Sequence, residues 1–162
     1  MTKIELIANI QNAFKNIKLE DGVGLWEAQG IDDYADEKTM AELKKKDERN
    51  DWDKIPYKDL AFCYSSLSFF DAKGMRFYLP KFLIFDLLAD EINEKEGLNS
   101  PDMLFTLGHK LNEDYQKNRF SLLDLNQIQC IINYLYYKLP FEYDEFGLNK
   151  TIAAWTQKLN EQ

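Results

Sequence analysis

The sequence has few of the side chains on which most metal sites and catalytic centres depend. It contains one histidine, His109, and two cysteines, Cys63 and Cys130, which are not in a CxxC arrangement. One histidine excludes a metal site built from two or three histidines. The cysteine spacing argues against both a disulfide framework and a thiolate zinc site, so we expect free thiols in a reducing compartment.

Glycine-rich phosphate loops and nucleophile motifs are also missing. The seven glycines are scattered, and neither GxGxxG nor GxxxxGK[ST] occurs. The sequence therefore lacks both common loops that bind nucleotide phosphates. No GxSxG elbow surrounds Ser65, Ser66 or Ser68. His109 falls opposite the apolar stripe of its segment and is expected to be exposed. We therefore assign no catalytic residue, no metal ligand and no cofactor, and we expect the protein not to be an enzyme.

Long apolar runs are absent as well. The richest stretch, FYLPKFLIF, is interrupted by Pro80 and Lys81 and is shorter than the roughly 18 to 20 apolar residues that span a bilayer. The first residues, MTKIELIANIQNAF, mix polar with apolar side chains and lack the apolar core of a signal peptide. We therefore expect a cytoplasmic protein that does not contact a membrane.

Negative charge exceeds positive charge along the chain. Twenty Lys and Arg against 28 Asp and Glu give a formal net charge of −8. Such a surface repels phosphate backbones, so nucleic acid is not an expected partner. A basic protein is a more suitable partner, because complementary charge accelerates encounter and excludes wrong partners. Solubility alone explains the charge equally well, and the oligomeric state stays open.

The pattern of apolar residues predicts a mainly α fold in a single domain over residues 1–162. A chain of 162 residues with 45% hydrophobic content suits one core. Residues 25–55 are helix-permissive, with Gly30 bending or dividing them. Apolar side chains recur at steps of three and four in five further segments, 4–17, 80–93, 104–115, 125–139 and 148–159.

One region departs from the helical period and predicts a β-hairpin near residues 66–79. SLSFF and MRFYL are short β-prone runs separated by DAKG, where Asp71 and Gly74 suit a turn. Pro80 would then open the following helix, which we expect to be central because it is apolar on nearly all sides. The predicted fold is a compact assembly of about six or seven helices with this hairpin.

An acidic segment with nearby aromatic residues is the most distinctive surface feature. In IDDYADE, helical spacing places Asp32 near Asp36 and Asp33 near Glu37. We predict a partner-binding surface made of Trp26, Asp32, Asp33, Tyr34, Asp36, Glu37 and Trp52. Two alternatives are a solvated helix face and a carboxylate pair that holds a cation or moves a proton.

Arg76 is a single cation within an aromatic run. A buried guanidinium needs a carboxylate, because an unpaired buried charge is costly. We predict a structural ion pair between Arg76 and one of the nearby acids, with Asp33 as the first choice. The alternative is a small-ligand or metal-binding protein or enzyme with a pocket near Arg76 and Asp32 or Asp33.

Three stretches together carry a resemblance to known sequences. IDDYADE, WDKIP and LSFFDAKGMRFYLPKFL resemble a family of small bacterial proteins of unknown function whose shared core reads LDDY, W..I and G.RFYLP. The likeness covers roughly residues 20–93 and implies a bacterial cytoplasmic protein without an assigned activity. In size, acidity and aromatic content the chain also resembles immunity proteins that neutralise bacterial toxins. These observations predict a non-enzymatic interaction module whose partner is a basic protein such as a toxin.

Overall fold

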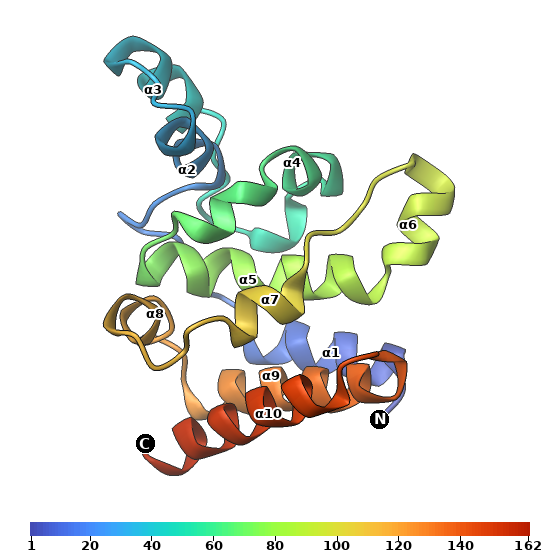
Figure 1. The fold of residues 1–162 in the computed structure, drawn as a ribbon. Helices are drawn as coiled ribbons and strands as arrows, with labels where there is room; N and C mark the ends of the chain where they lie inside the picture. The colour runs from blue at the N-terminus through green and yellow to red at the C-terminus, as the bar shows by residue number, and fades with distance from the viewer.

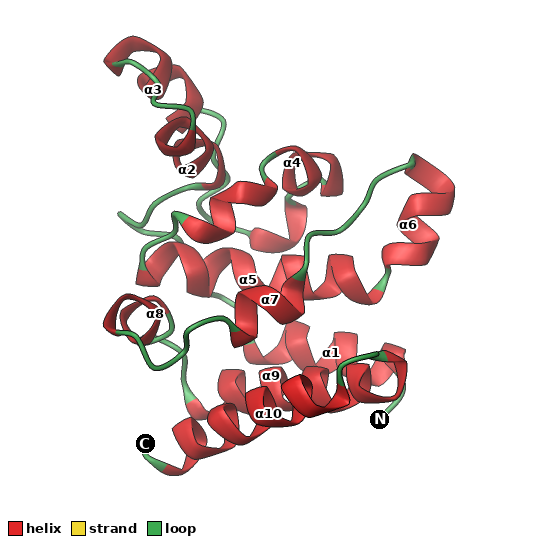
Figure 2. Ribbon diagram, in the orientation of Figure 1, coloured by secondary structure: helices red, strands yellow, loops and turns green.

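The chain is helical from end to end in the computed structural model, which describes residues Met1–Gln162 and contains no β-strand (Figure 2). The first six α-helices are α1 (Lys3–Ala13), α2 (Leu25–Asp32), α3 (Glu37–Lys44), α4 (Tyr57–Phe62), α5 (Ala72–Leu87) and α6 (Ala89–Glu96). The other four are α7 (Met103–Gly108), α8 (Asp114–Arg119), α9 (Leu125–Lys138) and α10 (Glu145–Asn160). Short 3-10 helices lie at η1 (Trp52–Lys54), η2 (Tyr64–Ser68) and η3 (Leu139–Phe141). A mainly α fold is confirmed, with ten α-helices instead of six or seven.

Helix α5 is surrounded by the rest of the molecule. Twelve of its 16 residues are buried, so it has no polar face to give to solvent. It contacts α1, α6, α7, α8 and η1, and Figure 1 shows it between the α2–α4 region and the layer of α1, α9 and α10. The predicted central helix is therefore present, although it begins eight residues before Pro80. No helix of the molecule has both the length and the apolar character to cross a membrane.

The predicted β-hairpin is wrong, because its supposed turn starts a helix. The Asp71 carboxylate accepts a hydrogen bond from the Gly74 backbone N–H at 2.8 Å, which caps α5. An Asp followed three residues later by Gly suits a turn or a helix start, since both use this bond. The segment Met75–Leu79 is buried on nearly all sides, and such a helix shows no apolar stripe that would separate it from a strand.

Pro80 lies inside α5 and not in its first turn. Its ring nitrogen has no hydrogen to donate to the carbonyl of Arg76, one turn earlier. The helix continues through this missing bond as far as Leu87, and Pro80 itself is buried. Packing on every side of α5 therefore outweighs the local preference of proline for a helix start.

The predicted ion pair between Arg76 and Asp33 is also wrong. Arg76 forms no salt bridge, and its Nε atom is buried without a hydrogen-bond partner. Asp33 is exposed at the end of α2 and accepts a hydrogen bond from Gln29 instead. Lys73 in the first turn of α5 pairs with the exposed Glu20 and Asp21. The more buried charged contacts of α5 lie nearer its middle and end, at Lys81 and Asp86.

Both of these contacts join α5 to distant parts of the chain. The Lys81 ammonium lies 3.0 Å from an Asp53 carboxylate oxygen of η1 and 4.6 Å from the centre of the Tyr57 ring. Asp86 accepts hydrogen bonds from the Tyr134 hydroxyl at 2.6 Å and from the Lys138 ammonium at 2.9 Å, both on α9. Lys81 and Asp86 thus each have a partner of opposite charge, which lowers the cost of their burial.

The two bonds to Asp71 lead to a stability prediction. The same Asp71 oxygen that caps α5 also accepts a hydrogen bond from the Val23 N–H at 3.0 Å. Asp71→Ala should lower the free energy of unfolding by about 2 kcal/mol, because it removes a cap and leaves a second N–H unpaired. Denaturant unfolding measures this loss.

Asp36→Ala is the matched control. Asp36 is exposed and caps α3 through the single Thr39 N–H, at 2.8 Å. Its loss should be about 1 kcal/mol or less, the usual value of one exposed cap. Equal losses in the two variants would contradict a second role for Asp71.

Candidate functional site

Helices α2 and α3 form a helical hairpin at one end of the molecule (Figure 1). Helix α3 has no buried residue and packs mainly on α2. Gly30 makes this contact possible, since a Cβ there would lie 2.8 Å from Leu43 Cδ1 and 3.0 Å from the end of Met40. Gly30 therefore brings the two helices together and does not divide α2. We call residues 32–37, between and including the ends of these helices, the hairpin tip.

Tyr34 at the hairpin tip has a backbone conformation that normally favours glycine. Its φ is 52°, in the left-handed region, and its side chain is 95% exposed. The Tyr34 N–H donates to the Ile31 carbonyl and the Ala35 N–H to the Gly30 carbonyl, which are the two bonds of a Schellman motif. A side chain in this conformation costs roughly 1 to 2 kcal/mol. Because the exposed ring gains almost no packing in return, the fold itself gives no reason for a tyrosine here.

The carboxylates of the hairpin tip have no cation partner. Asp33, Asp36 and Glu37 are exposed and Asp32 is half-buried, and none of the four forms a salt bridge. Asp36 caps α3, and the backbone N–H of Thr39 lowers the pKa of its carboxyl group. The structure thus gathers these predicted residues in one negatively charged protrusion around Tyr34.

The two tryptophans predicted for the surface have different positions. Trp52 is 5% exposed, and its indole N–H donates to the Phe14 carbonyl at 2.9 Å. It belongs to the core, so its assignment to a binding surface is wrong. Trp26 is half-buried, with the Phe62 ring centred 5.4 Å away and the Lys46 ammonium 4.6 Å from its own ring centre.

Asp47 fixes the first turn of α2, which we call the hairpin base, and the sequence did not predict this role. Its carboxylate accepts hydrogen bonds from the N–H groups of Trp26 at 2.6 Å and Glu27 at 3.3 Å, so it caps α2 from beyond α3. The N-cap residue of α2 is Gly24, which has no side chain to do so. A Cβ at Gly24 would lie 1.9 Å from Asp47 Oδ2. A glycine at a helix start was the available signal, because the cap must then come from elsewhere.

Burial changes the protonation of Asp47. Loss of solvent raises the pKa of its carboxyl group to about 6, although the two N–H donors and Arg49 act in the opposite direction. A helix cap that is half-protonated near pH 6 makes this part of the hairpin base sensitive to pH.

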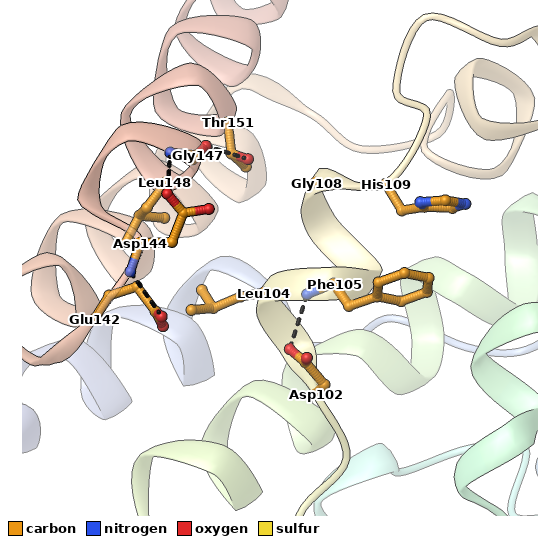
Figure 3. Close-up of a pocket in the computed structure, with 10 residues that line it drawn as sticks. All are labelled: Asp102, Leu104, Phe105, Gly108, His109, Glu142, Asp144, Gly147, Leu148 and Thr151. Carbon is orange, nitrogen blue, oxygen red and sulfur yellow. Dashed lines mark hydrogen bonds between the residues drawn. The ribbon is translucent and has the colours of Figure 1, made fainter.

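A separate groove of about 360 Å³ lies between α7 and the start of α10 (Figure 3). Its three carboxylates bind backbone N–H groups: Asp102 that of Phe105, Asp144 that of Gly147, and Glu142 that of Tyr143. His109 is exposed, as predicted, and stacks on the Phe105 ring with the centres 4.5 Å apart. Two helix caps, Asp102 and Asp144, and a turn before α10 held by Glu142 explain the acidic character of this groove.

The small-ligand alternative gains no support from the arrangement of its residues. None of the five principal cavities is lined by Arg76, Asp32 or Asp33. No group of three or more His, Cys, Asp or Glu side chains is placed to hold a metal ion. The hairpin tip is therefore the site on which the sequence prediction and the geometry agree best.

The raised pKa of Asp47 predicts a pH dependence of stability. Folded Asp47 binds its proton more tightly than unfolded Asp47, with a pKa of about 6 against 3.8. The folded state thus holds more protons between these values, so the contribution of Asp47 is fully present at low pH and is lost as pH rises through 6. The unfolding free energy of wild type minus that of Asp47→Asn should fall by about 2 kcal/mol from pH 4 to pH 7.

Denaturant unfolding at a series of pH values measures this difference. Asp36→Asn is the control of opposite sign, because the pKa of Asp36 is lowered and its contribution is lost as pH falls. If the difference in unfolding free energy between wild type and Asp47→Asn stays constant or increases with pH, burial does not disfavour the ionised form of Asp47.

The conformation of Tyr34 predicts an unusual response to glycine. Tyr34→Gly should leave the free energy of unfolding unchanged or raise it by up to about 1 kcal/mol, because relief of the left-handed strain offsets the extra freedom of the unfolded chain. Tyr143→Gly is the control: Tyr143 is fully exposed but does not have a positive φ. That variant should lose about 0.5 to 1 kcal/mol. Equal losses in thermal and denaturant unfolding would argue against strain at Tyr34.

Comparison with known proteins identifies a family but no activity. A family model described as a family of unknown function (DUF6714) matches residues 2–158, well beyond the segment that carries the sequence resemblance. No curated protein and no solved structure matches the chain. Because the matched range takes in nearly every helix described above, the chain belongs to this family of unknown function, DUF6714.

Proposed function

We propose that this protein is a non-enzymatic interaction module that binds a basic protein through the hairpin tip. The observation that carries the proposal is Tyr34, a fully exposed aromatic side chain in a strained backbone conformation where glycine would be more stable. Strain of this kind concentrates at functional positions. Tyrosine is also one of the residue types enriched at the centres of protein interfaces.

Charge around Tyr34 supports a basic partner. The four tip carboxylates of Asp32, Asp33, Asp36 and Glu37 are free of salt bridges, so their field is directed to solvent. Such a field raises the rate of encounter with a positive surface and opposes binding of nucleic acid. The overall net charge of −8 acts in the same direction.

A fixed hairpin base supports binding without large rearrangement. Asp47 holds the first turn of α2, and the buried Ser66 hydroxyl donates to the Leu25 carbonyl at 2.7 Å. The tip is therefore presented in one position before the partner arrives. Less conformational freedom is then lost on binding.

The specific form of the proposal is an immunity-type protein that neutralises a basic toxin in the bacterial cytoplasm. Size, acidity and aromatic content support this role. Cys63 and Cys130 are both free and buried, and burial raises the pKa of each thiol to about 12. Two unreactive thiols without a disulfide suit a reducing compartment.

A charge-reversal experiment tests the role of the hairpin tip. The tagged protein is used to capture its partner from a lysate of the organism that encodes it, and the partner is then purified for calorimetry. Asp33→Lys with Glu37→Lys should weaken binding at least about tenfold, which is about 1.4 kcal/mol, and binding should also weaken as salt rises.

The control makes the same change of net charge elsewhere. Glu94 on α6 and Glu161 after α10 are exposed, so Glu94→Lys with Glu161→Lys should bind as wild type does. If no basic protein is retained at any ionic strength, or if both double variants bind equally, the proposal is wrong.

A further inference from the structure

Two exposed aromatic side chains lie beside the α2–α3 hairpin. Phe62, the last residue of α4, is 66% exposed, and Tyr64, the first residue of η2, is 62% exposed. Between them, Cys63 is completely buried. The Phe62 ring packs against Trp26 of α2, with the ring centres 5.4 Å apart. We call Trp26, Phe62 and Tyr64 the aromatic patch.

Hydrogen bonds connect the aromatic patch to the hairpin tip. The Ser65 hydroxyl, next to Tyr64, donates to Gln29 Oε1 at 3.1 Å. The Gln29 amide in turn donates to an Asp33 carboxylate oxygen at 3.1 Å. Trp26, Gln29 and Asp33 are three and four residues apart, so they share one face of α2. Patch and tip are therefore adjoining parts of one surface, apolar at one end and acidic at the other.

Charge alone does not explain how this surface would bind tightly. Exposed ion pairs contribute about 0 to 1 kcal/mol each, so the carboxylates at the tip mainly steer a partner. Buried apolar area supplies most affinity, and exposed aromatic side chains that lie together often mark where it is buried. One face of the Trp26 ring already holds a cation of the chain itself, the Lys46 ammonium at 4.6 Å from the ring centre, so the patch offers a partner mainly apolar area.

We propose that the partner contributes an amphipathic cationic segment, with its lysine or arginine side chains at the hairpin tip and its apolar side chains on the aromatic patch. This inference rests on the proposed function and specifies the chemistry of the partner. A second copy of this chain does not supply the cationic segment, because in an isologous pair each copy offers the other the same surface of acidic tip and aromatic patch. An anionic lipid surface is repelled by the same carboxylates.

Two synthetic peptides of equal length and charge serve as probes. One has lysine and leucine at helical spacing, and the other has serine in place of leucine. Trp52 and Trp155 are 5% and 1% exposed, so acrylamide quenching of tryptophan fluorescence reports mainly on Trp26. The lysine–leucine peptide should bind at least about tenfold more tightly, or about 1.4 kcal/mol, and should protect Trp26 from quenching.

Variants of the aromatic patch separate its role from that of the tip. Phe62→Ser with Tyr64→Ser should lose the preference for the lysine–leucine peptide, and circular dichroism should show an intact fold because both side chains are largely exposed. Phe141→Ser with Tyr143→Ser is the control, since these aromatics are 74% and 103% exposed near η3 and the start of α10. That variant should keep the preference.

Each of three results would overturn the inference. They are equal binding of the two peptides by wild type, unchanged preference in the Phe62 and Tyr64 variant, and no binding of either peptide. If the Asp33 and Glu37 variant loses the native partner while the Phe62 and Tyr64 variant keeps it, the proposed function stands and only the inference fails.

Discussion

The fold depends on the complete enclosure of α5. A helix with 12 of 16 residues buried has to be covered on every side, and the elements that cover it come from both halves of the chain. Two of its charged side chains, Lys81 and Asp86, are largely shielded from solvent, and a partner of opposite charge lowers the cost of burying each. Lys81 has Asp53 and the face of Tyr57, whereas Asp86 has Tyr134 and Lys138. These contacts fix η1 on one side of α5 and α9 on the other.

Helix α5 also positions the candidate site, although the site lies outside the core. Asp71 at the start of α5 binds the Val23 N–H just before α2, and the Tyr78 hydroxyl donates to the Glu48 carbonyl just after α3. Both ends of the α2–α3 hairpin are thus bonded to the most buried element of the molecule. A hairpin whose second helix buries no residue can therefore project into solvent and still be held firmly.

Sequence patterns predicted the helical class and the central helix, because apolar spacing and all-round apolar character are local properties. They failed where one local pattern serves two structures. DAKG suits a turn as well as a helix start. A tryptophan such as Trp52 is common both in cores and at binding surfaces, so its identity alone does not predict its burial. The acidic tip was predictable from IDDYADE. The strain at Tyr34 and the cap from Asp47 were not, since both depend on the three-dimensional path of the chain.

The contact between Gly24 and Asp47 restricts how this protein can diverge. No side chain fits at position 24 while an aspartate occupies position 47, and α2 loses its cap when that aspartate is lost. A serine at position 24 would cap the helix itself, but only beside a smaller residue at position 47. The two positions should therefore change together among related sequences, although 22 residues separate them.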